Sequence, residues 1–166
     1  MSNIISLDSD TISISNGLTA VFIDVLILAG SRLAETDDEK RLIVWLAEKD
    51  QSKVGMGTVG FDIREMPWNI ERFEESRRFM LKTVELACNK TDWDNLDYIP
   101  NEELLFPMLN KFSYMLSKLT AKDVDQNALA GWMADADLDD PVKNGFPQCE
   151  KHSALLSCFG CHLCNN

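Results

Sequence analysis

Cysteine and histidine are concentrated near the C-terminal end of this 166-residue sequence. Two pairs of these residues, Cys149-x2-His152 and Cys161-x2-Cys164, are separated by eight positions. Thiolate and imidazole are the ligands that Zn²⁺ prefers, and two intervening residues let one tight turn present both side chains to the same ion. The spacing therefore predicts a structural zinc knuckle formed by Cys149, His152, Cys161 and Cys164.

This ligand set would form a closed metal site. Three thiolates and one neutral imidazole around Zn²⁺ leave a net charge of about −1 and fill all four tetrahedral positions. No position remains for a catalytic water. Gly160 suits the sharp turn that must deliver Cys161. We expect the knuckle to act as a clip that pins the tail to the main body.

Two other residues compete for the metal. Cys158-x2-Cys161 is an alternative ligand pair, and His162 is a second imidazole in the same tail. Spacing alone therefore leaves the exact four ligands open. Free thiols without a metal are the remaining interpretation.

A run of aspartates, Asp135-x-Asp137-x-Asp139-Asp140, begins like a calcium-binding loop. The EF-hand pattern then requires Gly at the sixth position and Glu at the twelfth, where this chain has Asp140 and Phe146. A solvated acidic loop and a patch that receives a basic partner are the better interpretations.

The main body offers little catalytic chemistry. The glycine-rich segment 55–60 lacks the Walker phosphate-loop pattern. Asp62 and Glu65 are a candidate acid/base pair for an enzyme, but both histidines lie in the tail. Cys88 falls within an apolar stripe and is predicted to be a core residue. We therefore expect a protein that is not an enzyme.

The net charge is strongly negative. The sequence has 27 acidic and 16 basic residues, a formal charge of −11 and a pI near 4.5. This balance argues against binding to nucleic acid and against docking on anionic membranes. Residues 91–140 contain 11 acidic and three basic residues, so this segment carries most of the excess. A basic partner is the expected complement.

The predicted partner-binding residues are acidic side chains of residues 91–140, with two tryptophans as possible anchors. They are Asp135, Asp137, Asp139, Asp140, Asp92, Asp94, Asp97, Glu102, Glu103, Trp93 and Trp132.

The predicted compartment is the cytoplasm. The first ten residues contain no Lys or Arg, and Asp8 and Asp10 interrupt any signal-peptide core. The apolar run 20–30 is too short to span a bilayer and contains Asp24. An odd number of cysteines, most of them in the tail, argues against a disulfide framework.

Hydrophobic periodicity predicts a mainly α, single-domain protein with a few short strands. Residues 4–17 are a strand or an irregular lead-in, and 18–34 are a buried helix or strand whose length favours a helix. Thr36 and Glu39 form a capping box that opens a helix over 37–49. The glycine-rich residues 50–68 offer only short strand-like pieces.

Three further helices are expected. Asn69 is a candidate N-cap for a long helix to about residue 90, and Asn101 caps another in which Pro107 forces a kink or a restart. A short helix is expected within 122–134. The organisation is thus a mostly helical acidic domain over 1–145 and a zinc-knuckle tail over 146–166.

Two segments carry a resemblance to a known class of proteins. The first contains WLA at 45–47, DQ at 50–51, GTVGFDI at 57–63, PW at 67–68, FEE at 73–75, Phe79 and LK at 81–82. The second is the ending with Cys149, His152, Gly160, Cys161 and Cys164. Over residues 40–164 the chain resembles small bacterial immunity proteins of contact-dependent and polymorphic toxin systems.

The resemblance implies that the chain binds a cognate toxin domain, frequently a nuclease, and blocks it. A basic toxin would match the acidic residues 91–140. The alternatives are a zinc-ribbon regulatory or nucleic-acid-associated protein, and an enzyme that uses Asp62 and Glu65.

Overall fold

The chain begins with a β-hairpin in the computed structural model, which describes residues 2–164. Strands β1 (Ser2–Leu7) and β2 (Asp10–Ser15) pair antiparallel, with Ile5 opposite Ile12. Alternation places Ile5, Leu7, Ile12 and Ile14 on one buried face. The sequence allowed either a strand or an irregular lead-in for residues 4–17, and the structure shows that most of them are strand.

A two-residue strand, β3 (Phe61–Asp62), extends the hairpin by pairing parallel to β1, so the sheet order is β2-β1-β3. Gly60 makes this pairing possible. A Cβ at position 60 would lie 2.2 Å from the carbonyl oxygen of Ile4. Only glycine lets the two backbones approach this closely.

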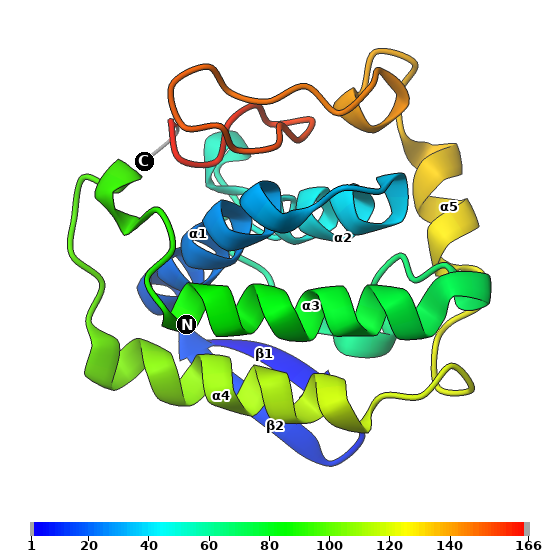
Figure 1. Ribbon diagram of the computed structural model, residues 1–166, viewed down its shortest axis with the longest axis horizontal. Helices are drawn as coiled ribbons and strands as arrows, with labels where there is room; N and C mark the ends of the chain where they lie inside the picture. The colour runs from blue at the N-terminus through cyan, green and yellow to red at the C-terminus, as the bar shows by residue number, and fades with distance from the viewer. Residues whose placement is uncertain (1, 165–166) are drawn as a thin grey trace.

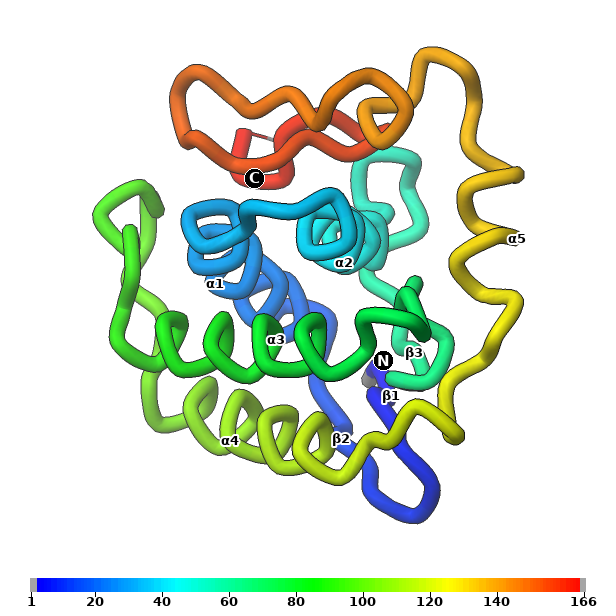
Figure 2. The backbone as a smooth tube through the Cα atoms, turned by 45° about the vertical axis from the view of Figure 1, so that its right-hand side comes forward, coloured from blue at the N-terminus to red at the C-terminus, as the bar shows by residue number. Residues whose placement is uncertain are grey.

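Helix α1 (Asn16–Leu33) is the central element of the fold (Figures 1 and 2). The Ser15 hydroxyl accepts a hydrogen bond from the Leu18 amide and caps the helix. Helices α2, α3 and α4 and the hairpin all contact α1. It is long and apolar enough to cross a membrane by composition, but most of its residues are buried within this fold.

The other helices pack around α1. Thr36 and Glu39 form the predicted capping box of α2 (Asp37–Ala47). Asn69 caps a short 3₁₀ turn, η3 (Ile70–Arg72), and α3 (Phe73–Cys88) follows it. Asn101 caps α4 (Glu102–Lys118), which continues through Pro107, so of the kink or restart expected there the restart is excluded. Helix α5 (Ala128–Asp135) is the shortest.

Aromatic side chains join these elements into one core. Phe61 of β3 makes edge-to-face contacts with Trp45 of α2, at 5.0 Å between ring centroids, and with Phe112 of α4, at 6.5 Å. Phe112 also meets Phe22 of α1 at 5.3 Å. The described residues thus form the mainly α fold with a small sheet that the sequence predicts.

The tail runs across α1 and α2 (Figure 1). The Leu155 amide donates a hydrogen bond to the Ser31 hydroxyl of α1 at 3.0 Å. Phe146, Ala154, Leu155 and Leu163 are buried in the same hydrophobic core as the helices. The tail therefore packs against the body rather than standing apart from it. Met1, Asn165 and Asn166 lie outside the described residues.

The acidic residues of 91–140 do not form one surface. The connector between α3 and α4, which includes the 3₁₀ turn η4 (Trp93–Asn95), lies at one side of the molecule. The acidic loop after α5 lies at the opposite side in both views (Figures 1 and 2). Any partner-binding surface must therefore be assigned to one side or the other.

Candidate metal centre

Two turns present the four predicted metal ligands. The first spans Cys149 to Ala154, where the Cys149 amide donates to the Ala154 carbonyl and the Ser153 amide to the Cys149 carbonyl, both at 2.8 Å. The second is a tight turn in which Ser157 and Gly160 bridge each other. Gly160 adopts a φ of +87°, which an L-residue rarely takes, and this turn delivers Cys161.

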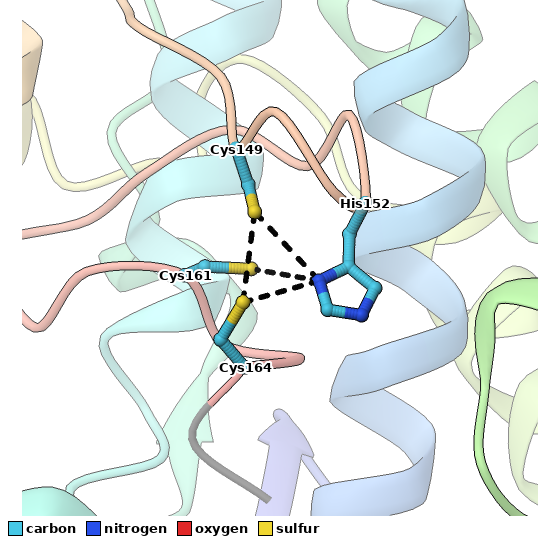
Figure 3. Close-up of side chains that lie close together, drawn as sticks. All are labelled: Cys149, His152, Cys161 and Cys164. Carbon is cyan, nitrogen blue, oxygen red and sulfur yellow. Dashed lines mark hydrogen bonds between the residues drawn. The ribbon is translucent and has the colours of Figure 1, made fainter.

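The side chains of Cys149, His152, Cys161 and Cys164 converge on one point (Figure 3). The Nδ1 atom of His152 lies 3.7, 3.6 and 3.2 Å from the Sγ atoms of Cys149, Cys161 and Cys164, respectively. The Sγ atoms of Cys149 and Cys164 are 3.6 Å apart. The four residues therefore form a cluster that could bind a metal ion.

These separations can be compared with those of a tetrahedral zinc site. Zn–S and Zn–N bonds of about 2.3 and 2.0–2.1 Å require S···S and S···N separations of about 3.8 and 3.6 Å. The observed S···S and S···N separations are close to these values. The cluster is therefore consistent with zinc in size and in donor chemistry.

Backbone amides also point at the sulfur atoms, with the same spacing in both turns. Cys149 receives hydrogen bonds from the amides of Lys151 and His152, and Cys161 from those of Leu163 and Cys164. Burial opposes ionisation of Cys149, but these hydrogen bonds, together with those of the His152 and Cys164 side chains, lower its pKa to about 6. Burial and the neighbouring Cys149 and Cys164 side chains raise the pKa of Cys161 to about 12 despite its two amide donors. Amides aimed at sulfur in this way stabilise thiolates, which are the form that binds metal.

The competing residues lie elsewhere. Cys158 is exposed and lies close to Glu48 and Asp140 instead of joining the other cysteines. His162 is buried and points into the body. The structure thus brings together the four residues that the zinc-knuckle prediction named, and it separates the two alternatives from them.

His162 belongs to a buried polar network that the sequence analysis did not predict. Its Nδ1 lies 2.5 Å from Oδ1 of Asp24 in α1, and its Nε2 lies 2.8 Å from Oδ2 of Asp50. The Tyr98 hydroxyl donates to Oδ2 of Asp24 at 2.5 Å. Ser52 donates to Asp50 from both its amide and its hydroxyl. The network ties the tail to α1, to the end of α2 and to the connector.

The electrostatics of this network are those of a buried ion triplet. Burial alone would lower the pKa of His162, but its hydrogen bonds with Asp24 and Asp50 raise that pKa to about 9. The hydrogen bond from His162 lowers the pKa of Asp50 to about 2. The imidazolium is thus held between two carboxylates, beside the candidate metal ligand Cys161 in the sequence. An aspartate within an otherwise apolar helix was the one available signal.

Of the candidate acid/base pair Asp62 and Glu65, Asp62 is held in a structural contact with Arg64. Both oxygens of Asp62 accept hydrogen bonds from the Arg64 guanidinium, at 2.9 and 2.7 Å, and these bonds lower the pKa of Asp62. Glu65 is exposed. Cys88 is half-buried near the end of α3, and its burial raises its pKa.

On the connector side, some of the predicted partner-binding acids already have partners within the chain. Asp92 forms an ion pair with Arg32 at 3.0 Å, and Glu102 pairs with Lys90. Asp94, Asp97 and Glu103 are exposed. Trp93 is half-buried and packs against Phe106.

On the α5 side, Asp135, Asp137 and Asp139 are exposed, but Asp140 is not. Asp140 is only 8% exposed, and its Oδ1 caps the 3₁₀ turn η5 (Pro141–Lys143) by accepting from the Val142 amide. Its low exposure argues against Asp140 as a partner-facing charge. Trp132 is half-buried and donates from Nε1 to Glu48 Oε2 at 2.8 Å.

Comparisons of the chain with protein-family models, curated proteins and solved structures found no match.

Proposed function

We propose that this chain is a cytoplasmic immunity-type protein that neutralises a basic toxin domain, such as a nuclease, by binding it tightly. In this proposal, Cys149, His152, Cys161 and Cys164 hold one structural Zn²⁺. The ion fills its shell with protein ligands, so it supplies folding stability and no catalytic water. The five cysteines form no disulfide, which supports a reducing compartment.

The observation that carries the proposal is an exposed acidic and apolar strip at the connector. We name it the connector edge and define it as Asp94, Asp97, Ile99, Glu103 and Leu104. Ile99 is 93% exposed and Leu104 is 56% exposed. Among residues 2–164, no basic side chain forms an ion pair with the three acids of this strip.

This combination suits recognition of a basic protein. Apolar side chains in the middle of an interface supply contact energy once water is excluded, while surrounding charges orient the partner. The acids would occupy the basic cleft that a nuclease uses for its phosphate substrate. Complementary charges can raise association rate constants to about 10⁸ M⁻¹s⁻¹ at low salt.

The test begins with the reading frame immediately upstream, which we expect to encode a large secreted protein. Its C-terminal domain is expressed with and without this chain, and both growth and direct binding are measured. Protection from toxicity with a 1:1 complex supports the proposal. Normal growth without the chain, or the lack of any complex, contradicts it.

A charge-matched pair of triple variants then tests the surface. D94N/D97N/E103Q neutralises the connector edge, and D135N/D137N/D139N removes the same charge on the opposite side. We expect the first to lower the association rate constant about tenfold or more at low salt, and the second to change it little. An equal or reversed effect of the two variants would exclude the connector edge.

A further inference from the structure

A second cluster of potential metal ligands lies where α2 ends. Glu48 is the C-cap of α2, Asp140 is the N-cap of η5, and Cys158 lies in the turn that precedes Cys161. One carboxylate oxygen of each acid and the Sγ of Cys158 all lie within 4.8 Å of one another. Three segments that are distant in sequence therefore bring two carboxylates and a thiol to one point.

The two carboxylates lie close together, and neither is paired with a cation among the described residues. Asp140 is 8% exposed and Glu48 is half-buried. Burial raises the pKa of Glu48, and the charge of Asp140 raises it further. In the described part of the chain, no Lys, Arg or His forms an ion pair with either acid. Like charges placed together away from water are costly without a counter-charge.

The nearby basic side chains point elsewhere. The Lys49 ammonium lies over the Trp45 ring, 4.0 Å from its centroid, and the Lys53 ammonium donates to the Phe159 carbonyl at 2.9 Å. Only neutral donors hold the two acids: Glu48 accepts from the Trp132 indole and from the Cys158 thiol, and Asp140 Oδ1 accepts from the Val142 amide. The other oxygen of Asp140, Oδ2, receives no hydrogen bond within residues 2–164.

We propose that Glu48, Asp140 and Cys158 form a second divalent-metal site, suited to Zn²⁺ and separate from the knuckle. A divalent cation would supply the counter-charge that the two carboxylates lack. One thiolate with two carboxylates favours a borderline-soft metal over Ca²⁺ or Mg²⁺, which take oxygen ligands only. Coordination also ionises the thiol, because a bound cation deprotonates a coordinating cysteine outright.

This site differs from the knuckle in being open. Three protein ligands leave the fourth tetrahedral position to water, and Cys158 is exposed to solvent. The ion at this site should therefore exchange more readily than the knuckle ion. When bound, it links the end of α2 to the tail and to the segment that follows α5.

Cobalt is the probe for the experiment. The full chain is first loaded with one Zn²⁺, which occupies the knuckle and resists displacement because zinc binds such sites more tightly than cobalt. Co²⁺ is then titrated, with native mass spectrometry to count ions and with absorption to detect thiolate-to-cobalt charge transfer. We expect one additional ion accompanied by a charge-transfer band.

Matched variants assign the ion to the cluster. C158S should abolish the band, and both C158S and E48Q should weaken Co²⁺ binding at least tenfold. C88S removes a different thiol and D139N removes a neighbouring exposed acid, so both should behave as the wild type. Circular dichroism and the knuckle zinc content confirm that each variant is folded.

Alkylation of unmodified protein gives an independent measurement. In the zinc-loaded wild type, Co²⁺ should slow the reaction of exposed Cys158 with iodoacetamide. The proposal is overturned if no second ion binds, if C158S binds it as tightly as the wild type does, or if Co²⁺ leaves the alkylation rate unchanged.

Discussion

Replacing His162 by Gln should destabilise the protein far more than replacing an ordinary tail residue. The substitution removes the cation that lies 2.5 Å from Asp24 and 2.8 Å from Asp50. All three side chains are less than 10% exposed. Removing one partner of a buried ion pair leaves an uncompensated charge and typically costs about 3–5 kcal/mol. We expect H162Q to fall within that range.

The assay is urea unfolding of zinc-saturated protein, followed by circular dichroism at pH 7. Zinc per chain is measured first, so that loss of the knuckle ion is not mistaken for loss of the ion triplet. D24N provides the partner variant for a double-mutant cycle. Because D24N removes one of the two carboxylates that H162Q would strand, the double variant should cost less than the sum of the single variants.

Tyr98→Phe provides a graded comparison. It removes one hydrogen bond to a charged group, which contributes about 1.5–3 kcal/mol, and leaves the ion triplet in place. Its effect should therefore be smaller than that of H162Q. A loss below about 1 kcal/mol for H162Q, or strict additivity of D24N and H162Q, would refute the interpretation of His162 as a buried imidazolium.

Three further predictions concern the metal and the backbone. Removing zinc with a chelator should lower the thermal midpoint and release residues 149–164 to rapid hydrogen exchange; unchanged exchange would exclude a structural ion. Gly60→Ala would place a Cβ against the Ile4 carbonyl and should lower the free energy of unfolding, measured in urea, by at least about 1–3 kcal/mol. Gly131→Ala has open space around it and should stabilise α5 by about 0.5–1 kcal/mol. Equal effects of the two variants would show that the close approach of Gly60 to Ile4 does not require glycine. Pro107→Ala should stabilise α4 by about 1 kcal/mol or more, because it restores a backbone donor inside the helix; a decrease would show that Pro107 is needed there.

Local sequence signals predicted much of the fold. The Thr36 and Glu39 capping box marks the start of α2, since both of its hydrogen bonds lie within four residues. The length of the apolar segment that contains Asp24 favoured the helix that the structure has as α1. The metal cluster was also predictable, because each ligand pair is carried by one short turn whose geometry depends on nearby residues.

Features that depend on distant contacts were not predictable in the same way. Strand β3 has only two residues, and its pairing with β1 follows from the close approach at Gly60 and not from any periodicity. His162 and Asp50 are 112 positions apart, so spacing could not separate a metal ligand from an ion-pair partner. The sequence also could not place the acidic residues of 91–140 on opposite sides of the molecule.

The long separation between Asp24 and His162 has a consequence for protein synthesis. Ribosomes add about 5–20 residues per second, so the imidazolium that faces Asp24 is made roughly ten seconds after α1. Throughout that interval the apolar central helix lacks the tail that covers it. The zinc ligands are also made last. In the proposed zinc-bound form, the ion can therefore stabilise the fold only after synthesis is almost complete.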